Sequence, residues 1–271
     1  MSFLHPPQRH SSPTHVPCVR TLHLQSFPFR LLRACVRETL CFFTDDSQFV
    51  DSPLSSLGMA QAGALATFLS HARTEEHGLT KAEAAAHALV RASPGAPGSV
   101  IATSTLRRAA STVAISCAER LRRTGETVYA LSDLQEMSPN VDTLALAARG
   151  MAPPLREKQA QSMRCSGAHN AGNKPVRGRA DVRLQGFAEW CFTVAQGQLG
   201  ATGVVAAGHS LWFRAFMDTY LPKSVAHESR KKKVRNCALL AFTLQKGVTA
   251  EGKAVFRIVP ESIAMVYGGY H

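Results

Sequence analysis

The chain has 271 residues, of which 45% are hydrophobic and 18% charged, so it can bury a sizeable core as one large domain. Its 31 lysines and arginines outnumber 19 acidic residues, and the formal charge of +12 favours anionic ligands, nucleic acid or acidic surfaces. No apolar run is long enough to span a membrane, and seven cysteines without a CxxC pair indicate free thiols in a reducing compartment, which excludes a disulfide framework.

Residues 1–28 are rich in proline, serine and histidine, and the first acidic residue of the chain is Glu38. This composition supplies no core face and fits either a disordered arm or an organellar targeting segment. We favour the disordered arm, place the domain over residues 29–271, and expect a cytoplasmic protein without a membrane partner. The short apolar run Phe29–Arg33 predicts the first strand of that domain.

The middle of the chain alternates helix and strand patterns. Helical spacing of apolar residues predicts a helix from residue 59 to about 72 and another over residues 81–91. The run 99–104 predicts a buried strand, and residues 105–122 predict the helix that follows it. Residues 128–134 predict a further strand, which Ser132 and Asp133 interrupt.

The second half begins with a basic stretch at about 150–180, which lacks sustained periodicity and predicts a loop. A helix with an aromatic cluster at 187–194 should follow, and the apolar run 204–207 predicts a buried strand that leads into a helix after Ser210. Residues 236–244 and 254–259 predict closing strands. The alternation favours an α/β fold, a three-layer sandwich with a mainly parallel central sheet.

Three strand ends carry side chains suited to phosphate chemistry: Arg107 or Arg108, Glu136, and His209. Parallel strands bring their carboxyl ends to one edge of a sheet, where helix N-termini attract anions. An arginine there can bind a phosphate with two hydrogen bonds, a carboxyl group can protonate a leaving oxygen, and an imidazole can stabilise a transferring phosphoryl group. A surface arginine, an exposed glutamate and a helix-start histidine are the ordinary structural alternatives.

Four blocks of sequence resemble the histidine phosphatase superfamily, also called phosphoglycerate mutase-like. They occur in the family's order across residues 29 to 245: Asp51-x-x-Leu54-Ser55-x-x-Gly58-x-x-Gln61-Ala62, Ser104-x-Leu106-x-Arg108-Ala109-x-x-Thr112, Leu134-x-Glu136 and Gly208-His209-Ser210. The resemblance implies a phosphoglycerate mutase-like fold and phosphomonoester hydrolysis more than mutase activity. It also implies no cofactor, and a phosphorylated small molecule or phosphoprotein as the partner.

The resemblance also implies roles for single residues. Arg108 corresponds to the family's phosphate-binding arginine, Glu136 to its proton donor, and His209 to the second histidine, which contacts the phosphoryl group. The family's first strand ends in Arg-His-Gly or Arg-His-Ala, and its histidine attacks phosphorus. Here Arg33-Ala34-Cys35 stands at that point. Arg33 would then add to the phosphate site, and Ala34 would occupy the place of the nucleophile and impair the covalent step.

Three explanations of this departure stay open. The chain is a pseudo-enzyme that keeps an anion pocket through Arg33, Arg108 and His209. Alternatively, its first forty or so residues come from an incorrect gene prediction, with the authentic start encoded elsewhere. In the third explanation, Cys35 or His23 replaces the nucleophile.

A different class of function also stays open. A non-enzymatic interaction protein could bind acidic partners or nucleic acid through the basic segments 156–179 and 230–233. The sequence carries no nucleic-acid-binding motif, and its histidines lack metal-ligand spacing, so we expect neither a nucleic-acid partner nor a metal site.

Overall fold

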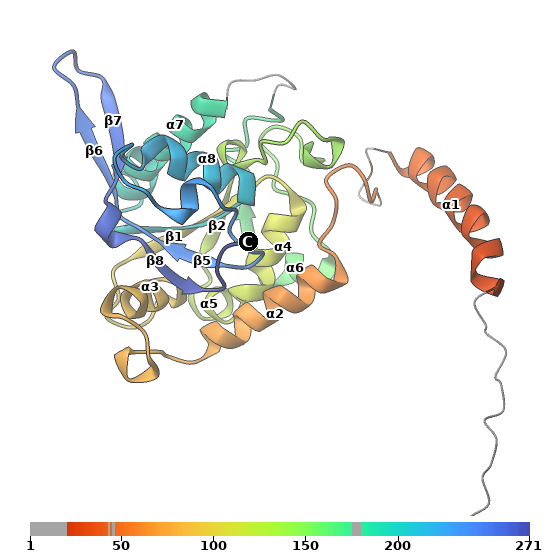
Figure 1. Ribbon diagram of the computed structural model, residues 1–271, viewed down its shortest axis with the longest axis horizontal. Helices are drawn as coiled ribbons and strands as arrows, with labels where there is room; N and C mark the ends of the chain where they lie inside the picture. The colour runs from red at the N-terminus through yellow and green to blue at the C-terminus, as the bar shows by residue number, and fades with distance from the viewer. Residues whose placement is uncertain (1–20, 43, 45–46, 175–179) are drawn as a thin grey trace, which may run out of the picture. The chain divides into compact units, whose positions relative to one another are not determined.

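The computed structural model describes residues 21–42, 44, 47–174 and 180–271 and divides the chain into two compact units, Met1–Cys41 and Phe42–His271 (Figure 1). In the first unit, the described residues form the helix α1 (Thr21–Cys41). The predicted strand over Phe29–Arg33 is therefore wrong. A five-residue apolar run fits a strand and one face of a helix equally well, and residues 29, 32 and 36 share a helical face.

The second unit is built on a four-stranded parallel sheet with the order β3-β2-β1-β4. Its strands are β1 (Ser99–Ser104), β2 (Thr127–Leu131), β3 (Arg164–Ser166) and β4 (Gly203–Ala207). Small and β-branched residues fill β1 and β4, as expected for strands that are covered on both faces.

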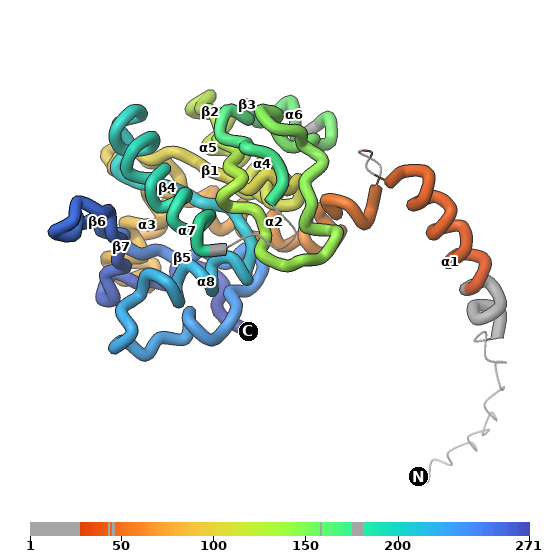
Figure 2. Tube along the Cα trace, turned by 90° about the horizontal axis from the view of Figure 1, so that it is seen from above, coloured from red at the N-terminus to blue at the C-terminus, as the bar shows by residue number. Residues whose placement is uncertain are grey.

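Alternate residues of the strands enter two different cores, which makes the sheet the middle of three layers (Figures 1 and 2). Ala102 packs into the core that contains α7 (Ala180–Trp190) and α8 (Ser210–Tyr220). Its neighbour Ile101 packs into the core that contains α4 (Arg107–Ser116) and α5 (Ala118–Thr124). The expected α/β architecture with a parallel sheet and helices on both faces is confirmed.

Outer elements complete this unit. The helices are α2 (Ser56–Ser70), α3 (Lys81–Arg91) and α6 (Glu157–Ser162). Four further strands form two antiparallel pairs, β5 (Leu239–Ala241) with β8 (Ala264–Tyr267), and β6 (Leu244–Val248) with β7 (Ala254–Ile258). In Figure 1 the β6–β7 hairpin extends away from the sheet. Among the described residues, none of the helices combines the length and apolar character of a transmembrane span.

Several local predictions are confirmed, and the differences have physical causes. The helix α3 matches its predicted bounds because Thr80 and Glu83 form a capping box at its start. The helix predicted over 105–122 is divided at Cys117 into α4 and α5. The predicted basic loop contains α6 and the edge strand β3, whose three residues are too few to show a periodic pattern.

Candidate functional site

The carboxyl ends of three parallel strands meet at one edge of the sheet. Ser104 at the end of β1 lies beside Leu131 of β2, and Thr103 lies beside Ala207 of β4. The segments that leave these strands carry Arg108, Glu136 and His209. The edge predicted to collect the three groups is therefore present, and loops and helix N-termini surround it.

His209 lies between β4 and α8 and is only 8% exposed. Its Nε2 is 2.9 Å from the Ser104 hydroxyl oxygen, which ties the ends of β4 and β1 together. The indole Nε1 of Trp212 donates to the Asp133 carbonyl at 2.6 Å and holds α8 against the segment after β2.

The charges around His209 are positive. Burial lowers the pKa of its imidazole well below the ordinary value, and Arg108, Lys174 and Arg183 lower the pKa further. The ring is therefore neutral at pH 7, and its Nδ1 makes no hydrogen bond within the described part of the chain. A neutral imidazole adds no charge to balance the three cations near it. This arrangement favours the binding of an anion.

The two candidate arginines have different roles. Arg108 keeps a partly exposed side chain, with 21% of its surface accessible. It donates through Nη1 to the Asp142 carbonyl at 2.7 Å, and its Nη2 lies 3.6 Å from the Asp142 carboxylate. This contact holds the guanidinium at the carboxyl edge of the sheet and leaves part of it accessible to solvent. Of the pair, Arg108 is the arginine available to a ligand.

Arg107 instead holds the fold together. Its buried side chain donates to the carbonyls of Ser47, Val50 and Asp51. The Asp51 carboxylate accepts in return from the backbone N–H of Arg107 at 2.9 Å and of Leu146 at 3.1 Å. Burial raises the pKa of Asp51 to about 6. This latch joins three segments that are far apart in the sequence and positions the first turn of α4.

Glu136 is buried next to two cations that the sequence analysis missed. Its Oε1 accepts from the Met137 N–H at 2.7 Å, and its backbone carbonyl accepts from the Lys174 ammonium. Arg183 donates through Nη1 to the adjacent Gln135 carbonyl at 2.6 Å. Two basic side chains thus converge on consecutive carbonyls in the segment that follows β2.

The sequence did not assign Lys174 or Arg183 to this site, although Lys174 belongs to the basic segment 156–179 that was considered for acidic partners. Lys174 lies in the stretch without periodicity, and Arg183 lies in the first half of α7. Burial and the neighbouring Arg183 lower the pKa of Lys174 to about 8, while burial lowers the pKa of Arg183. The basic character of the predicted loop at about 150–180 was a hint for Lys174 alone, because Arg183 lies beyond that loop.

Other residues of the resemblance have structural roles. Ser55 caps α2 by accepting from the Gly58 N–H at 3.1 Å. Gly58 leaves room for Leu54, whose Cδ1 would lie 2.7 Å from an added Cβ. This part of the motif therefore encodes a tight helix entry.

The assignments at the front of the chain lose their basis. Arg33 was expected at the end of a strand in the sheet, but it lies on the exposed helix α1 of the first unit. Ala34 lies on the same helix, so the alignment that put it in the nucleophile's place rested on a strand that does not form. Cys35 is exposed on α1, and the side chain of His23 is outside the described residues.

Three other histidines of the described chain have side-chain partners of their own. His87 contacts the Phe68 carbonyl, His169 packs against Tyr129 and Trp190, and His227 contacts Ser229. Among the described residues, no three histidine, cysteine, aspartate or glutamate side chains gather in a way that could hold a metal ion.

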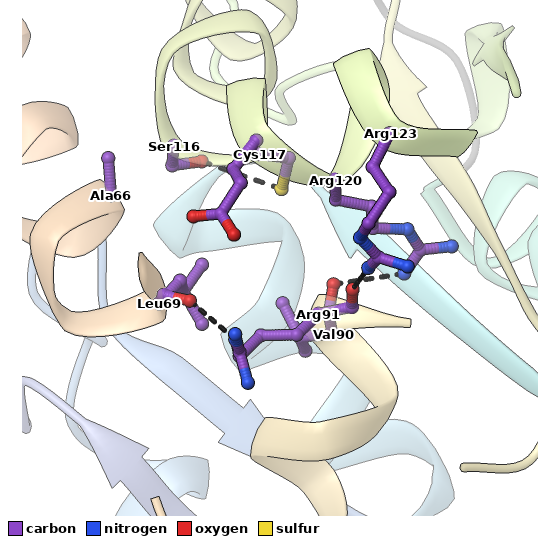
Figure 3. A pocket seen from close by; sticks show the side chains of 9 residues that line it. Ala66, Leu69, Val90, Arg91, Ser116, Cys117, Arg120 and Arg123 are labelled. Carbon is purple, nitrogen blue, oxygen red and sulfur yellow. Dashed lines mark hydrogen bonds between the residues drawn. The ribbon is translucent and has the colours of Figure 1, made fainter. Parts of the chain in front are cut away.

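A small pocket lies at the opposite edge of the sheet (Figure 3). Its volume of about 40 Å³ admits a few water molecules. Figure 3 shows Arg91, Arg120 and Arg123 around it, and Arg120 bonds to the Ser99 carbonyl at the beginning of β1. Protein carbonyls and a carboxylate accept from these arginines. The pocket is therefore a structural junction between α2, α3 and α5.

Comparison with known proteins adds little to this geometry. The sequence matches no family model and no curated protein. Among solved structures it is similar to a native mycobacterial glucosyl-3-phosphoglycerate phosphatase, with 18% identity, a TM-score of 0.39, and coverage of 79% of this chain and 91% of that chain. A likeness at this level carries no weight for the roles of single residues, which rest on the contacts described above.

Proposed function

We propose that the carboxyl edge of the sheet binds the phosphate group of a phosphorylated small molecule or phosphoprotein, in a domain of the histidine phosphatase type. One observation carries the proposal: the buried neutral His209 is surrounded by Arg108, Lys174 and Arg183, and every charge that shifts its pKa is positive. A phosphate placed there would offset this excess of positive charge. The motif blocks of the sequence support the same assignment.

The proposed roles follow from the position of each group. Arg108 binds phosphate oxygens with its partly exposed guanidinium, and His209 contacts the phosphoryl group. Glu136 donates a proton to a leaving oxygen. The side chains of His87, His169 and His227 bond or pack with residues other than His209, so we propose that hydrolysis through phosphohistidine is impaired. On this view the chain binds phosphorylated ligands more effectively than it hydrolyses them.

Binding can be tested by thermal unfolding with inorganic phosphate or orthovanadate. Wild-type protein should be stabilised by about 2.7 kcal/mol when the anion reaches a hundred times its Kd. Arg108→Ala should lose most of this stabilisation. Arg164→Ala is the matched control, because Arg164 is an exposed arginine that bonds to the Gly125 carbonyl at the opposite edge. No stabilisation of the wild type, or equal stabilisation of Arg108→Ala, would contradict the proposal.

Impairment is tested separately with a panel of phosphomonoesters. We expect binding without turnover. Rapid hydrolysis that Glu136→Gln and His209→Asn both abolish would show that a nucleophile is present and that only the impairment is wrong.

The interaction-protein alternative predicts different behaviour. Its affinity for an acidic partner should fall steeply with salt and survive Arg108→Ala. Two of its basic residues are already paired, since Arg230 bonds to Asp218 at 2.9 Å and Lys232 bonds to Glu228 at 3.1 Å. Arg177 and Arg179 of the other segment lie outside the described residues.

A further inference from the structure

The helix α1 carries a row of large apolar side chains along one face. Phe29, Leu32, Val36 and Leu40 are spaced by three or four residues, which places them on one side of a helix. Their exposed fractions are 76%, 62%, 52% and 78%. Exposed apolar side chains gathered in this way mark an interaction surface.

A row of arginines lies directly beside the apolar row. Arg30, Arg33 and Arg37 follow Phe29, Leu32 and Val36 by one residue each, so they occupy the adjacent flank of the helix. All three are exposed, and no carboxylate pairs with them in the part of the chain that the structure describes. The combination requires a partner that accepts apolar groups and carries negative charge.

A second copy of the chain fits this requirement poorly. Two α1 helices joined through their apolar rows would bring like-charged arginine flanks near each other, which is unfavourable. An anionic lipid surface meets both conditions, because its acyl boundary accepts the apolar row and its phosphates accept the guanidinium groups. The charges on α1 also agree with its failure to qualify as a transmembrane span.

We propose, in place of the expectation of no membrane partner, that α1 is an interfacial helix that binds the protein to anionic lipid surfaces. The row Phe29, Leu32, Val36 and Leu40 enters the boundary between headgroups and acyl chains. The row Arg30, Arg33 and Arg37 lies at the level of the lipid phosphates. This proposal depends only on the first unit and is independent of the function proposed for the sheet edge.

The test is sedimentation of the full chain with phosphatidylcholine vesicles, with and without phosphatidylserine. The wild type should sediment with the anionic vesicles, and the bound fraction should fall as salt rises. Neutral vesicles should bind far less protein. Absence of binding to anionic vesicles would overturn the proposal.

Two neighbouring substitutions separate the apolar row from net charge. Leu32→Glu puts a carboxylate into the row and should reduce vesicle binding by at least about tenfold. Leu31→Glu changes the net charge equally but lies on the other side of the helix, where Leu31 is 53% exposed, and should retain most of the binding. Equal losses would contradict a defined face.

The variant Arg33→Gln tests the contribution of the arginine charges. It should weaken binding to anionic vesicles without changing the small amount of protein bound to neutral vesicles. Self-association of the wild type that Leu32→Glu abolishes, without any vesicle binding, would assign the face to a second copy and overturn the proposal.

Discussion

The two edges of the central sheet each gather three basic side chains, but they use them differently. At the amino edge, Arg120 is 4% exposed and bonds to the Leu89, Val90 and Ser99 carbonyls. It also forms two hydrogen bonds to the Glu126 carboxylate, at 2.6 and 2.7 Å. Every part of this guanidinium has a protein acceptor, so the edge is complete without a ligand.

At the carboxyl edge Lys174 also uses its donors within the protein, on the Glu136 and Ser138 carbonyls and the Thr143 hydroxyl. The two arginines of this edge, however, have fewer acceptors than Arg120. Arg183 has one hydrogen bond, to the Gln135 carbonyl, and Arg108 contacts only Asp142 across the described residues. Both influence the buried His209. The comparison teaches that the number of positive charges does not locate an anion site. What locates it is the supply of donors that the protein leaves unused around a buried polar group.

The largest effect on stability should come from the amino edge. Arg120→Met removes one partner of a buried ion pair and leaves several carbonyls without donors, so the free energy of unfolding should fall by about 3 to 5 kcal/mol. Chemical denaturation measures this change. Vanadate should still stabilise the folded variant, because the substitution is at the opposite edge. If the free energy of unfolding fell by less than about 1 kcal/mol, the arginine at the amino edge would not be needed for stability, and the proposed difference between the two edges would be wrong.

A smaller effect, dependent on pH, should come from His209. Its folded pKa lies well below the unfolded value of 6.5, so the unfolded chain binds more protons as the pH falls below 6.5. The wild type should therefore lose stability relative to His209→Asn below pH 6.5, by up to about 1.4 kcal/mol per pH unit. The measurement is denaturant unfolding from pH 7.5 downward.

Bound phosphate provides a check on this prediction. An anion beside the imidazole favours the protonated form, so phosphate should flatten the pH dependence of the wild type and leave that of His209→Asn unchanged. A wild-type profile that phosphate does not alter would separate His209 from the anion site.

The sequence predicted the carboxyl edge because its signals are local. The strand before His209 and the strand that ends at Ser104 are short runs of small and β-branched residues, and each is followed by a helical pattern. Parallel pairing then brings their ends together without further information. The choice between Arg107 and Arg108 was not local. It depends on Asp51, which lies 56 residues before Arg107. Asp51 bonds to Arg107 and thereby gives this arginine a structural role.

Other parts of the site could not be predicted for the same reason. Lys174 reaches Glu136 from 38 residues away, and no periodic pattern surrounds it. Arg183 lies in the first half of a helix whose Leu184, Phe187, Ala188 and Trp190 form part of the core. The wrong strand prediction at Phe29–Arg33 has a different cause. A run of five residues fits the repeat of a strand and that of a helix equally well, and only a longer stretch of sequence can distinguish the two.

The smallest effect on stability should come from Arg183, and it sharpens the comparison most. Burial lowers the pKa of its guanidinium, which shows that keeping the charged form inside the protein costs desolvation energy. Because Arg183→Met removes this cost together with the hydrogen bond, it should change the free energy of unfolding by less than about 1 kcal/mol. The same variant should bind vanadate roughly three to ten times more weakly, because one cation beside the anion is lost. Arg164→Met should change neither quantity. If Arg183→Met instead unfolded as easily as Arg120→Met and bound vanadate normally, the carboxyl edge would be a second structural junction, and its cations would need no ligand.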